Sequence, residues 1–302
     1  MAISAKLVKE LRERTDCGMM DCKKALTETD GDMEKAIDFL REKGLSKAAK
    51  KSGRIAAEGI VELAFSEDGK KGALIEVNAE TDFVAKNKEF VDMVDLFANI
   101  ALDSDVADVA ALEACPTEEG TVKDVLTAKI AKIGENMTIR RFAKFDEAGT
   151  VCVGYNHNGK IGVLLQLETE AAADEVQAMG RNVAMQVCSM NPQFVDESQV
   201  DPAYLEKEKE ILVQQALNEG KPQNIVEKMV AGRLKKELKE TCLMDQTFVM
   251  DGDLSVQQYV DKCAKEIGKE IKVKAFVRYE VGEGIEKKVD DLAAEVAKMT
   301  QA

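Results

Sequence analysis

The sequence predicts an α+β fold that is divided into several domains with antiparallel sheets. Three patterns lead to this prediction: helical spacing of apolar residues in residues 1–45, an alternating apolar pattern that occurs twice, and a charge-rich helical segment at 203–240. The 302 residues also exceed the roughly 250 to 300 at which a single core stops growing. We therefore expect more than one hydrophobic core.

Residues 1–45 are expected to form a domain of three short helices. Apolar residues recur at helical spacing in three runs, and polar turn sequences at 15–18 and 29–32 separate the runs. The apolar positions are Leu7, Val8 and Leu11, then Met20, Ala25 and Leu26, then Met33, Ala36, Ile37 and Leu40.

A basic stretch at 46–57 comes next. It fits either a phosphate-facing patch or a solvated linker, and we favour the linker because the protein as a whole is acidic. Its cations are Lys47, Lys50, Lys51 and Arg54.

An internal repeat occupies the middle of the chain. Strands predicted at 60–65 and 72–77 flank a turn, and a helix at about 89–102 follows them. The same order returns later, with strands at 151–155 and 162–167 around Asn158-Gly159 and a helix at about 174–190.

The best match in this repeat aligns Gly69-Lys70-Lys71-Gly72 with Gly159-Lys160-Ile161-Gly162. It predicts one turn type and two related α+β subdomains, although two hairpins can also resemble each other by chance. We assign the first subdomain to 58–147 and the second to 148–190 together with 241–281.

Residues 191–240 are expected to form a helical hairpin that projects from the second subdomain. The sequence Asn218-Glu219-Gly220-Lys221-Pro222 supplies the Gly and Pro that end one helix and begin the next. The narrow apolar seam fits either self-association or a hairpin packed on its own core. Its residues are Tyr204, Ile211, Leu212, Leu217, Ile225, Met229, Val230, Leu234 and Leu238.

The C-terminal part begins with an alternating strand at 271–281 and the turn sequence Gly282-Glu283-Gly284. An amphipathic helix is expected at 287–299, within a terminal module at 282–302. The pattern leaves open whether this helix docks on the body of the protein or on a partner.

Charge and cysteine content narrow the class of protein. The net charge of −14 repels phosphate backbones, so a protein partner is favoured over nucleic acid or an anionic membrane. Seven cysteines without a C-x-x-C pair indicate reduced thiols. Residues 1–11 contain charges where a signal peptide needs an apolar run, and no apolar run approaches the ~20 residues of a membrane span. We expect a cytoplasmic protein.

The sequence offers little for catalysis. His157 is the only histidine, which disfavours both a nucleophilic triad and a multi-histidine metal site. There is no phosphate-binding loop sequence, and Gly282-Glu283-Gly284 lacks the spacing of a dinucleotide fingerprint. We expect a non-enzymatic protein that has no cofactor and no nucleotide of its own. His157 itself fits a partner contact and an ordinary turn residue equally well.

The two copies of the repeat differ at one loop. Where the first hairpin leads into its helix, Phe83 stands among polar residues next to Asp82, whereas the second copy has Ala and Asp there. A phenylalanine in this place either folds back onto its own helix or projects as a rigid wedge beside a carboxylate. The sequence pattern does not choose between these two interpretations.

Several segments of the chain resemble the elongation factor Ts family. Two of them match signature segments of the family: Glu80-Thr81-Asp82-Phe83-Val84, and Leu11-Arg12-Glu13-Arg14-Thr15 with 18–26. Further resemblance at 132–136, 139–141, 162–164, 248–250 and 281–287 extends it over essentially the whole chain. The sequence departs from the family at Ala79, where members often have Cys, and at Lys86, where they often have Arg.

The resemblance implies a ubiquitin-associated-like domain at 1–45, two similar core subdomains, a coiled-coil hairpin capable of homodimer formation and a C-terminal helical module. It also implies guanine-nucleotide exchange on elongation factor Tu, the GTPase that carries aminoacyl-tRNA. In this family the segment Thr81, Asp82, Phe83 and Val84 enters the partner near its Mg²⁺ site.

Other contacts with elongation factor Tu are implied in the same way. Arg12, Met19 and Met20 match the family's N-terminal contact with the GTPase domain, and His157 matches a histidine that faces the partner. The alternative for the two methionines is core packing in the three-helix domain. The rival functions are a scaffold that only binds, and a hydrolase that relies on perturbed carboxylates.

Overall fold

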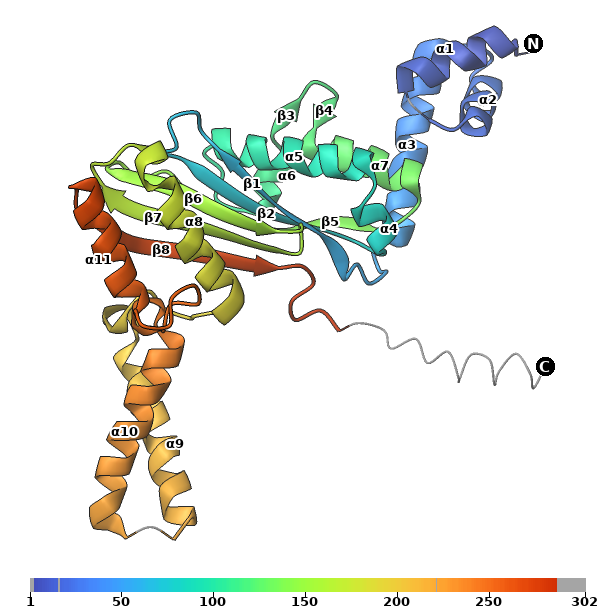
Figure 1. Cartoon of the computed structure of the whole chain (residues 1–302). Helices are drawn as coiled ribbons and strands as arrows, with labels where there is room; N and C mark the ends of the chain where they lie inside the picture. Colours follow the sequence, from blue (N-terminus) through green and yellow to red (C-terminus); the bar gives the residue numbers. More distant parts are fainter. Residues whose placement is uncertain (1–2, 16, 221, 287–302) are drawn as a thin grey trace. The chain divides into compact units, whose positions relative to one another are not determined.

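The computed structural model describes residues 3–15, 17–220 and 222–286. Helices and antiparallel sheets both contribute, which confirms the predicted α+β class (Figure 1). The chain divides into two compact units. Unit 1 comprises Met1–Val61, Ile75–Phe142 and Glu280–Ala302, and unit 2 comprises Glu62–Leu74 and Ala143–Tyr279.

Three helices open unit 1, as the apolar spacing predicts: α1 (Ala5–Thr15), α2 (Met19–Glu28) and α3 (Met33–Lys51). Asp32 caps α3 by accepting a hydrogen bond from the Lys35 amide. The buried core of these helices consists of Val8, Leu11, Cys22, Ala25, Leu26, Ala36 and Leu40. Met20, which the apolar spacing grouped with Ala25 and Leu26, does not belong to this core: it lies two residues before Cys22, which places it about 200° around the helix from the buried face.

Helix α3 continues to Lys51, into the segment for which the sequence favoured a linker. Three of the basic residues there have partners within unit 1, among them Arg54, whose Nη1 lies 3.4 Å from Glu80 Oε1. The Nζ of Lys47 lies 3.0 Å from a carboxylate oxygen of Asp21, and Lys51 donates to the carbonyl of Gly134. Because these contacts hold the last turns of α3 on neighbouring elements, residues 46–51 are helical.

The first hairpin consists of β1 (Glu58–Phe65) and β2 (Gly72–Ala79), and β5 (Met137–Phe145) completes a three-stranded sheet in the order β1-β2-β5. Between β2 and β5 lie α4 (Asp82–Ala85), α5 (Lys88–Asp103), α6 (Val109–Glu113) and α7 (Val122–Ile133), with the short strands β3 (Pro116–Thr117) and β4 (Gly120–Thr121). Helix α5 confirms the predicted helix at 89–102. Its apolar face, which includes Phe90 and Phe97, is fully buried.

Unit 2 contains the second hairpin, β6 (Thr150–His157) and β7 (Ile161–Thr169), with β8 (Ile271–Glu280) next to β7 in the order β6-β7-β8. Helices α8 (Ala173–Met190) and α11 (Val256–Ile267) share a hydrophobic core with these strands. Strand β6 runs antiparallel to β7, and Val153 is opposite Leu165. The order of strand, strand and helix therefore repeats as the sequence predicts.

The two hairpin turns are not of one type, contrary to the expectation. In the second hairpin the Lys160 amide donates to the His157 carbonyl, and both central residues, Asn158 and Gly159, have positive φ. In the first, the Ser66 amide donates to the Lys71 carbonyl across a longer loop, in which Gly69 has positive φ. Because the first loop contains extra residues, the two segments 69–72 and 159–162 are similar in sequence but not in turn geometry.

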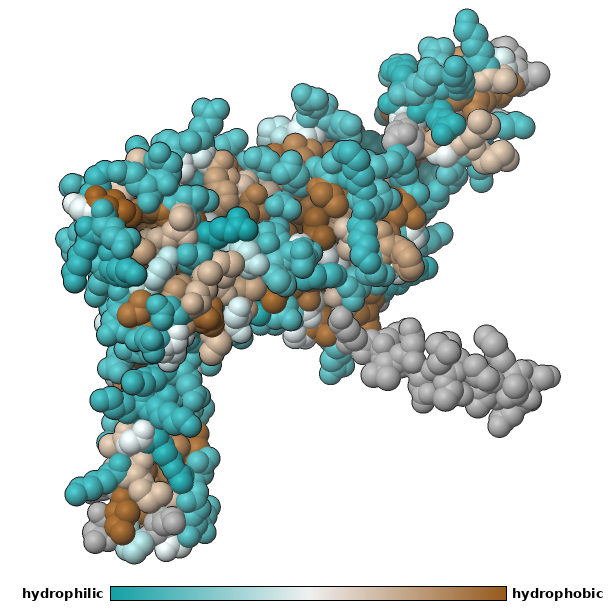
Figure 2. Space-filling model, viewed as in Figure 1, coloured by the Kyte–Doolittle hydropathy of each residue, from teal (hydrophilic) through white to brown (hydrophobic). Residues whose placement is uncertain are grey.

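Helices α9 (Pro202–Asn218) and α10 (Gln223–Thr241) form the predicted helical hairpin of unit 2. Gly220 has a φ of 72° and Pro222 is the N-cap of α10, so Gly and Pro act as expected. The predicted seam is only partly right, because the buried residues are Ala216, Val226 and Val230. Ile211, Leu217 and Ile225 are exposed, and Figure 2 shows hydrophobic surface near the end of the hairpin.

Gly282 and Gly284 both have positive φ in the turn that follows β8, and the predicted helix at 287–299 lies outside the described residues. The short 3-10 helices Glu197–Gln199 and Leu243–Asp245 lie on either side of the α9–α10 hairpin in the sequence. No helix in the described part of the chain is long and apolar enough to cross a membrane.

An ion pair within unit 1 provides a pH-dependent link between α3 and α7. Arg41 Nη2 lies 2.7 Å from Asp124 Oδ1, and this hydrogen bond, followed by those from Thr121, lowers the pKa of Asp124 to about 2. A lowered carboxylate pKa stabilises the fold above the unfolded pKa of about 4, and this contribution is lost as pH falls through the folded value.

We therefore expect Asp124→Asn to lower the free energy of unfolding by roughly 1–2 kcal/mol near neutral pH, allowing for partial solvent exposure. Asparagine keeps the cap acceptor but loses the charge, so the difference from wild type should shrink between about pH 4 and pH 2. Urea unfolding at several pH values measures it, with the exposed Asp92→Asn as the control. A difference that does not change with pH would contradict the assignment.

Candidate functional site

The segment Thr81–Val84 forms the start of the short helix α4 in unit 1. Thr81 is its N-cap, and its side chain accepts a hydrogen bond from the Val84 amide at 3.4 Å. Val84 and Ala85 are buried, whereas the side chain of Phe83 is 82% exposed. Phe83 therefore does not fold back onto its own helix, and the structure decides between the two interpretations of this loop in favour of projection.

Two carboxylates hold the loop from either side of Thr81. Glu135 accepts hydrogen bonds from the Thr81 amide at 3.0 Å and from the Thr81 hydroxyl at 2.8 Å. Glu80 accepts one from the Asn136 amide at 2.6 Å. These contacts were not foreseen, although Glu135 and Asn136 belong to one of the segments on which the resemblance rests.

Asp82 stands beside Phe83 and remains accessible. Its carboxylate lies 2.7 Å from the Nζ of Lys86, one helical turn later, and is 46% exposed. The hydrogen bond from Lys86 to Asp82 raises the pKa of Lys86. A partner that offered a stronger contact could replace this surface pair at small cost, since exposed ion pairs contribute about 0–1 kcal/mol.

The N-terminal residues named by the resemblance lie on the surface of α1 and α2. Met19 is 59% exposed and Met20 is 74% exposed, which excludes core packing for both. Arg12 is also exposed. Methionine is flexible and polarizable, so two neighbouring exposed methionines suit a contact surface.

His157 is exposed at the end of β6 in unit 2. Its Nδ1 lies 2.9 Å from the Tyr155 hydroxyl, and the guanidinium carbon of Arg181 lies 5.5 Å from the centre of the Tyr155 ring. Residues two apart on a strand share a face, which is the signal that could have linked Tyr155 with His157. When the Tyr155 hydroxyl donates to Nδ1, the imidazole keeps its proton on Nε2.

The predicted site residues thus occupy three places. Thr81, Asp82, Phe83 and Val84 form one turn in unit 1. Arg12, Met19 and Met20 lie on the three-helix domain. His157 lies in unit 2.

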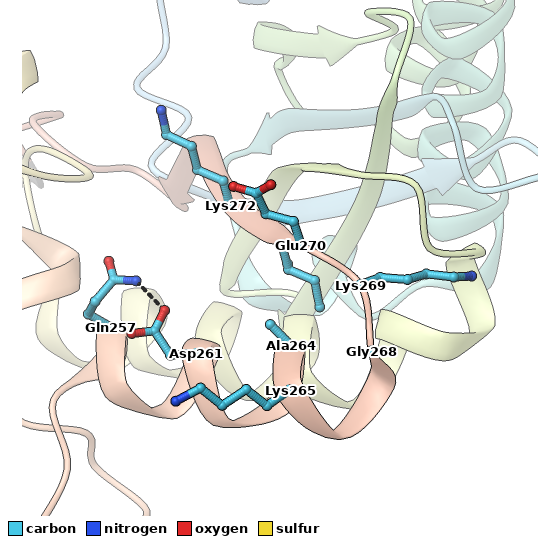
Figure 3. Close-up of a pocket in the computed structure, with 9 residues that line it drawn as sticks. Gln257, Asp261, Ala264, Lys265, Gly268, Lys269, Glu270 and Lys272 are labelled. Carbon is cyan, nitrogen blue, oxygen red and sulfur yellow. Dashed lines mark hydrogen bonds between the residues drawn. The ribbon is translucent and has the colours of Figure 1, made fainter.

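Two pockets of the structure lie away from these residues. One, of about 540 Å³, is an open hollow between α11 and the start of β8, and Figure 3 shows the side chains of Lys265, Lys269 and Lys272 pointing in different directions around it. Another, of about 640 Å³, lies beside α5, α7 and β3. Neither contains a predicted site residue. In the part of the chain that the structure describes, no three His, Cys, Asp or Glu side chains are grouped so as to hold a metal ion.

Comparison with known proteins agrees with the sequence resemblance. The family model for elongation factor TS matches residues 80–283. A relative named elongation factor Ts from Clostridioides difficile strain 630 is 56% identical over 298 residues, which cover 98% of each chain. Relatives of the same name from Clostridium perfringens strain SM101 and Clostridium tetani strain Massachusetts/E88 are 54% and 52% identical, and each alignment covers at least 98% of both chains. The chain belongs to the elongation factor Ts family.

Proposed function

We propose that this protein is a guanine-nucleotide exchange factor that makes elongation factor Tu release GDP during translation elongation in the cytoplasm. The observation that carries the proposal is the side chain of Phe83, a large apolar group that is 82% exposed on a turn anchored by buried neighbours. Exposing an aromatic ring to water is unfavourable, so such a residue suits burial in a partner.

The proposed mechanism acts on the way the GTPase holds its nucleotide. GDP in a phosphate-binding loop is held by backbone amides and by Mg²⁺, an ion that tolerates little departure from octahedral oxygen geometry. We propose that Phe83 inserts between side chains near this ion, while the Asp82 carboxylate competes for polar contacts that support it. Thr81 and Val84 hold the turn during insertion, the first as its cap and the second through burial.

Such a factor breaks no covalent bond and is not an enzyme in the usual sense. Linkage requires reciprocity: a factor that lowers the affinity of the GTPase for GDP is itself bound less tightly when GDP is present. GTP then reloads the partner by mass action.

Further contacts are proposed at the exposed residues Arg12, Met19 and Met20, at His157, and at the segment 287–299. The first three lie on a three-helix domain for which we propose a ubiquitin-associated-like fold. These contacts would provide most of the binding surface for elongation factor Tu, while the loop at 81–84 acts on the nucleotide site.

The decisive experiment is stopped-flow release of a fluorescent GDP analogue from purified elongation factor Tu, at fixed Mg²⁺ and with excess unlabelled GDP. We expect a large acceleration when this protein is added. If the protein bound elongation factor Tu without accelerating GDP release, it would be a scaffold that only binds and not an exchange factor.

We also propose that the α9–α10 hairpin forms a homodimer as a coiled coil. The support is the exposure of Ile211, Leu217 and Ile225 on an otherwise charged hairpin. A variant that lacks 204–238 should be a monomer in light scattering, with somewhat less than half of the wild-type mass because the deleted residues are also absent, while its exchange activity changes little. An unchanged number of chains per particle would contradict the dimer role.

A further inference from the structure

Two short segments of unit 1 bind each other reciprocally next to the exposed phenylalanine. Glu135 accepts from the amide and the hydroxyl of Thr81, and Glu80 accepts from the amide of Asn136. The Asn136 side chain also donates to the Arg54 carbonyl at 2.8 Å. The segments 80–81 and 135–136 are therefore joined by three charge-assisted hydrogen bonds, which are stronger than neutral ones.

The Glu135 end of this contact is held firmly. Helix α7 ends at Ile133, and Gly134 follows as its C-cap with a φ of 91°, a value that favours glycine. Asn136 and Met137 are buried where β5 begins. Glu135 thus projects from the junction of a helix and a strand, which restricts its backbone on both sides.

The Thr81 end, in contrast, depends on outside support. Helix α4 has only four residues, and so short a helix is unstable without tertiary contacts. The Thr81 hydroxyl has one hydrogen, which it donates to Glu135, so its lone pairs are left for the Val84 amide. The carboxylate of Glu135 therefore orients the cap that begins α4, two residues before Phe83.

We propose that Glu135 is a positioning residue that sets the direction of Phe83 by orienting the Thr81 cap. Glu135 does not touch the nucleotide site of the partner; it acts through Thr81. The expected effect of Glu135 on GDP release rests on the proposed exchange function. The effect of Glu135 on the loop does not depend on a partner.

Glu135→Ala should lower the maximal rate of GDP release from elongation factor Tu by roughly tenfold, since a hydrogen bond to a charged group carries about that weight. The concentration of factor at half-maximal rate should change little, because the other contacts remain. Glu135→Gln, which keeps one acceptor oxygen and nearly the same volume, should restore part of the rate. A loss confined to the half-maximal concentration would contradict positioning.

The matched control is Glu113→Ala. Glu113 is also a half-buried carboxylate of unit 1, and its partner Lys123 lies 3.2 Å away and apart from the loop. We expect this variant to exchange GDP at the wild-type rate. An equal loss in both variants would mean that general destabilisation lowers the rate.

A double variant tests whether Glu135 acts through Phe83. The rate of GDP release with Glu135→Ala and Phe83→Ala together should equal the rate with Phe83→Ala alone. Once the ring is removed, Glu135 has no ring to orient, so its loss should not lower the rate further. If the double variant instead lost rate by the product of the two single losses, the inference would be overturned while the exchange function would stand.

Hydrogen–deuterium exchange of the free protein separates this inference from the proposed function. Glu135→Ala should increase the exchange of the amides at 82–86 and leave the core of unit 2 unchanged. The hydrogen-exchange result could be found even if the wild-type protein did not accelerate GDP release. In that case the proposed nucleotide-exchange function would fail and the positioning of the loop would stand. Unchanged protection at 82–86 would overturn the positioning itself.

Discussion

Phe83→Ala is expected to slow the release of GDP from elongation factor Tu by about 30-fold or more, which is the effect of truncating an interface hot spot. The free energy of unfolding should change by no more than about 0.5 kcal/mol, because the Phe83 ring is 82% exposed and stabilises little in the free protein. Stopped-flow GDP release and urea unfolding of the same preparation measure both quantities.

Two controls make the Phe83 result specific. Leu96→Ala removes another exposed apolar side chain of unit 1 and should leave the exchange rate unchanged. Phe90→Ala removes a fully buried ring and should lower the stability by about 3–5 kcal/mol. If Phe83→Ala lost stability and exchange together, as a core residue would, the wedge mechanism would be wrong.

Asp82→Ala should act in the same direction as Phe83→Ala with a smaller effect. Its carboxylate is paired with Lys86 in the free protein, so this ion pair has to break before the carboxylate can contact the partner. The ring has no such competing partner in its exposed position.

Glu76→Ala is expected to produce a large loss of stability. Glu76 is 0% exposed, and its carboxylate lies 3.0 Å from Arg140 Nη1 and 2.6 Å from Arg141 Nε. It also accepts from the Gly282 amide at 2.8 Å. Removal of Glu76 takes this carboxylate from Arg140 and leaves Arg141 with the more exposed Glu283, 3.1 Å away. The loss of one partner from a buried ion cluster costs about 3–5 kcal/mol.

Urea unfolding measures this loss, and Glu34→Ala is the control. Glu34 pairs with Arg14 at 2.8 Å, but its side chain is 76% exposed, so we expect a change of about 0–1 kcal/mol. A loss for Glu76→Ala as small as that of the control would mean that water replaces the carboxylate around the two arginines.

The buried acid illustrates what the sequence could not predict. Glu76 stands in the alternating pattern of the first hairpin, where a glutamate is normally assigned to a solvated face. Its partners come from β5 and from the turn after β8, far away in the sequence. Strand β5 and helices α7 and α11 were not predicted at all, although Val122, Val125, Leu126 and Ile130 of α7 recur at helical spacing.

The candidate site shows the same division. Local sequence and the family resemblance were enough to single out Asp82 and Phe83, whereas the short helix α4 and its cap Thr81 became visible only in the structure. Glu135 is more than fifty residues away, and only the hydrogen bonds that its carboxylate accepts from the Thr81 amide and hydroxyl reveal a role. The same applies to Tyr155 and Arg181 around His157, since Arg181 comes from another element.

The sequence by itself determined the α+β class, the three N-terminal helices, both hairpins, the helical hairpin and the family, because periodicity, turn residues and motifs are local properties of the chain. Only the tertiary structure decided that Phe83, Met19 and Met20 are exposed and that Glu76 is buried. Exposure depends on which distant elements cover a side chain, and the energy of burial is set by that cover and not by the residues next in the sequence.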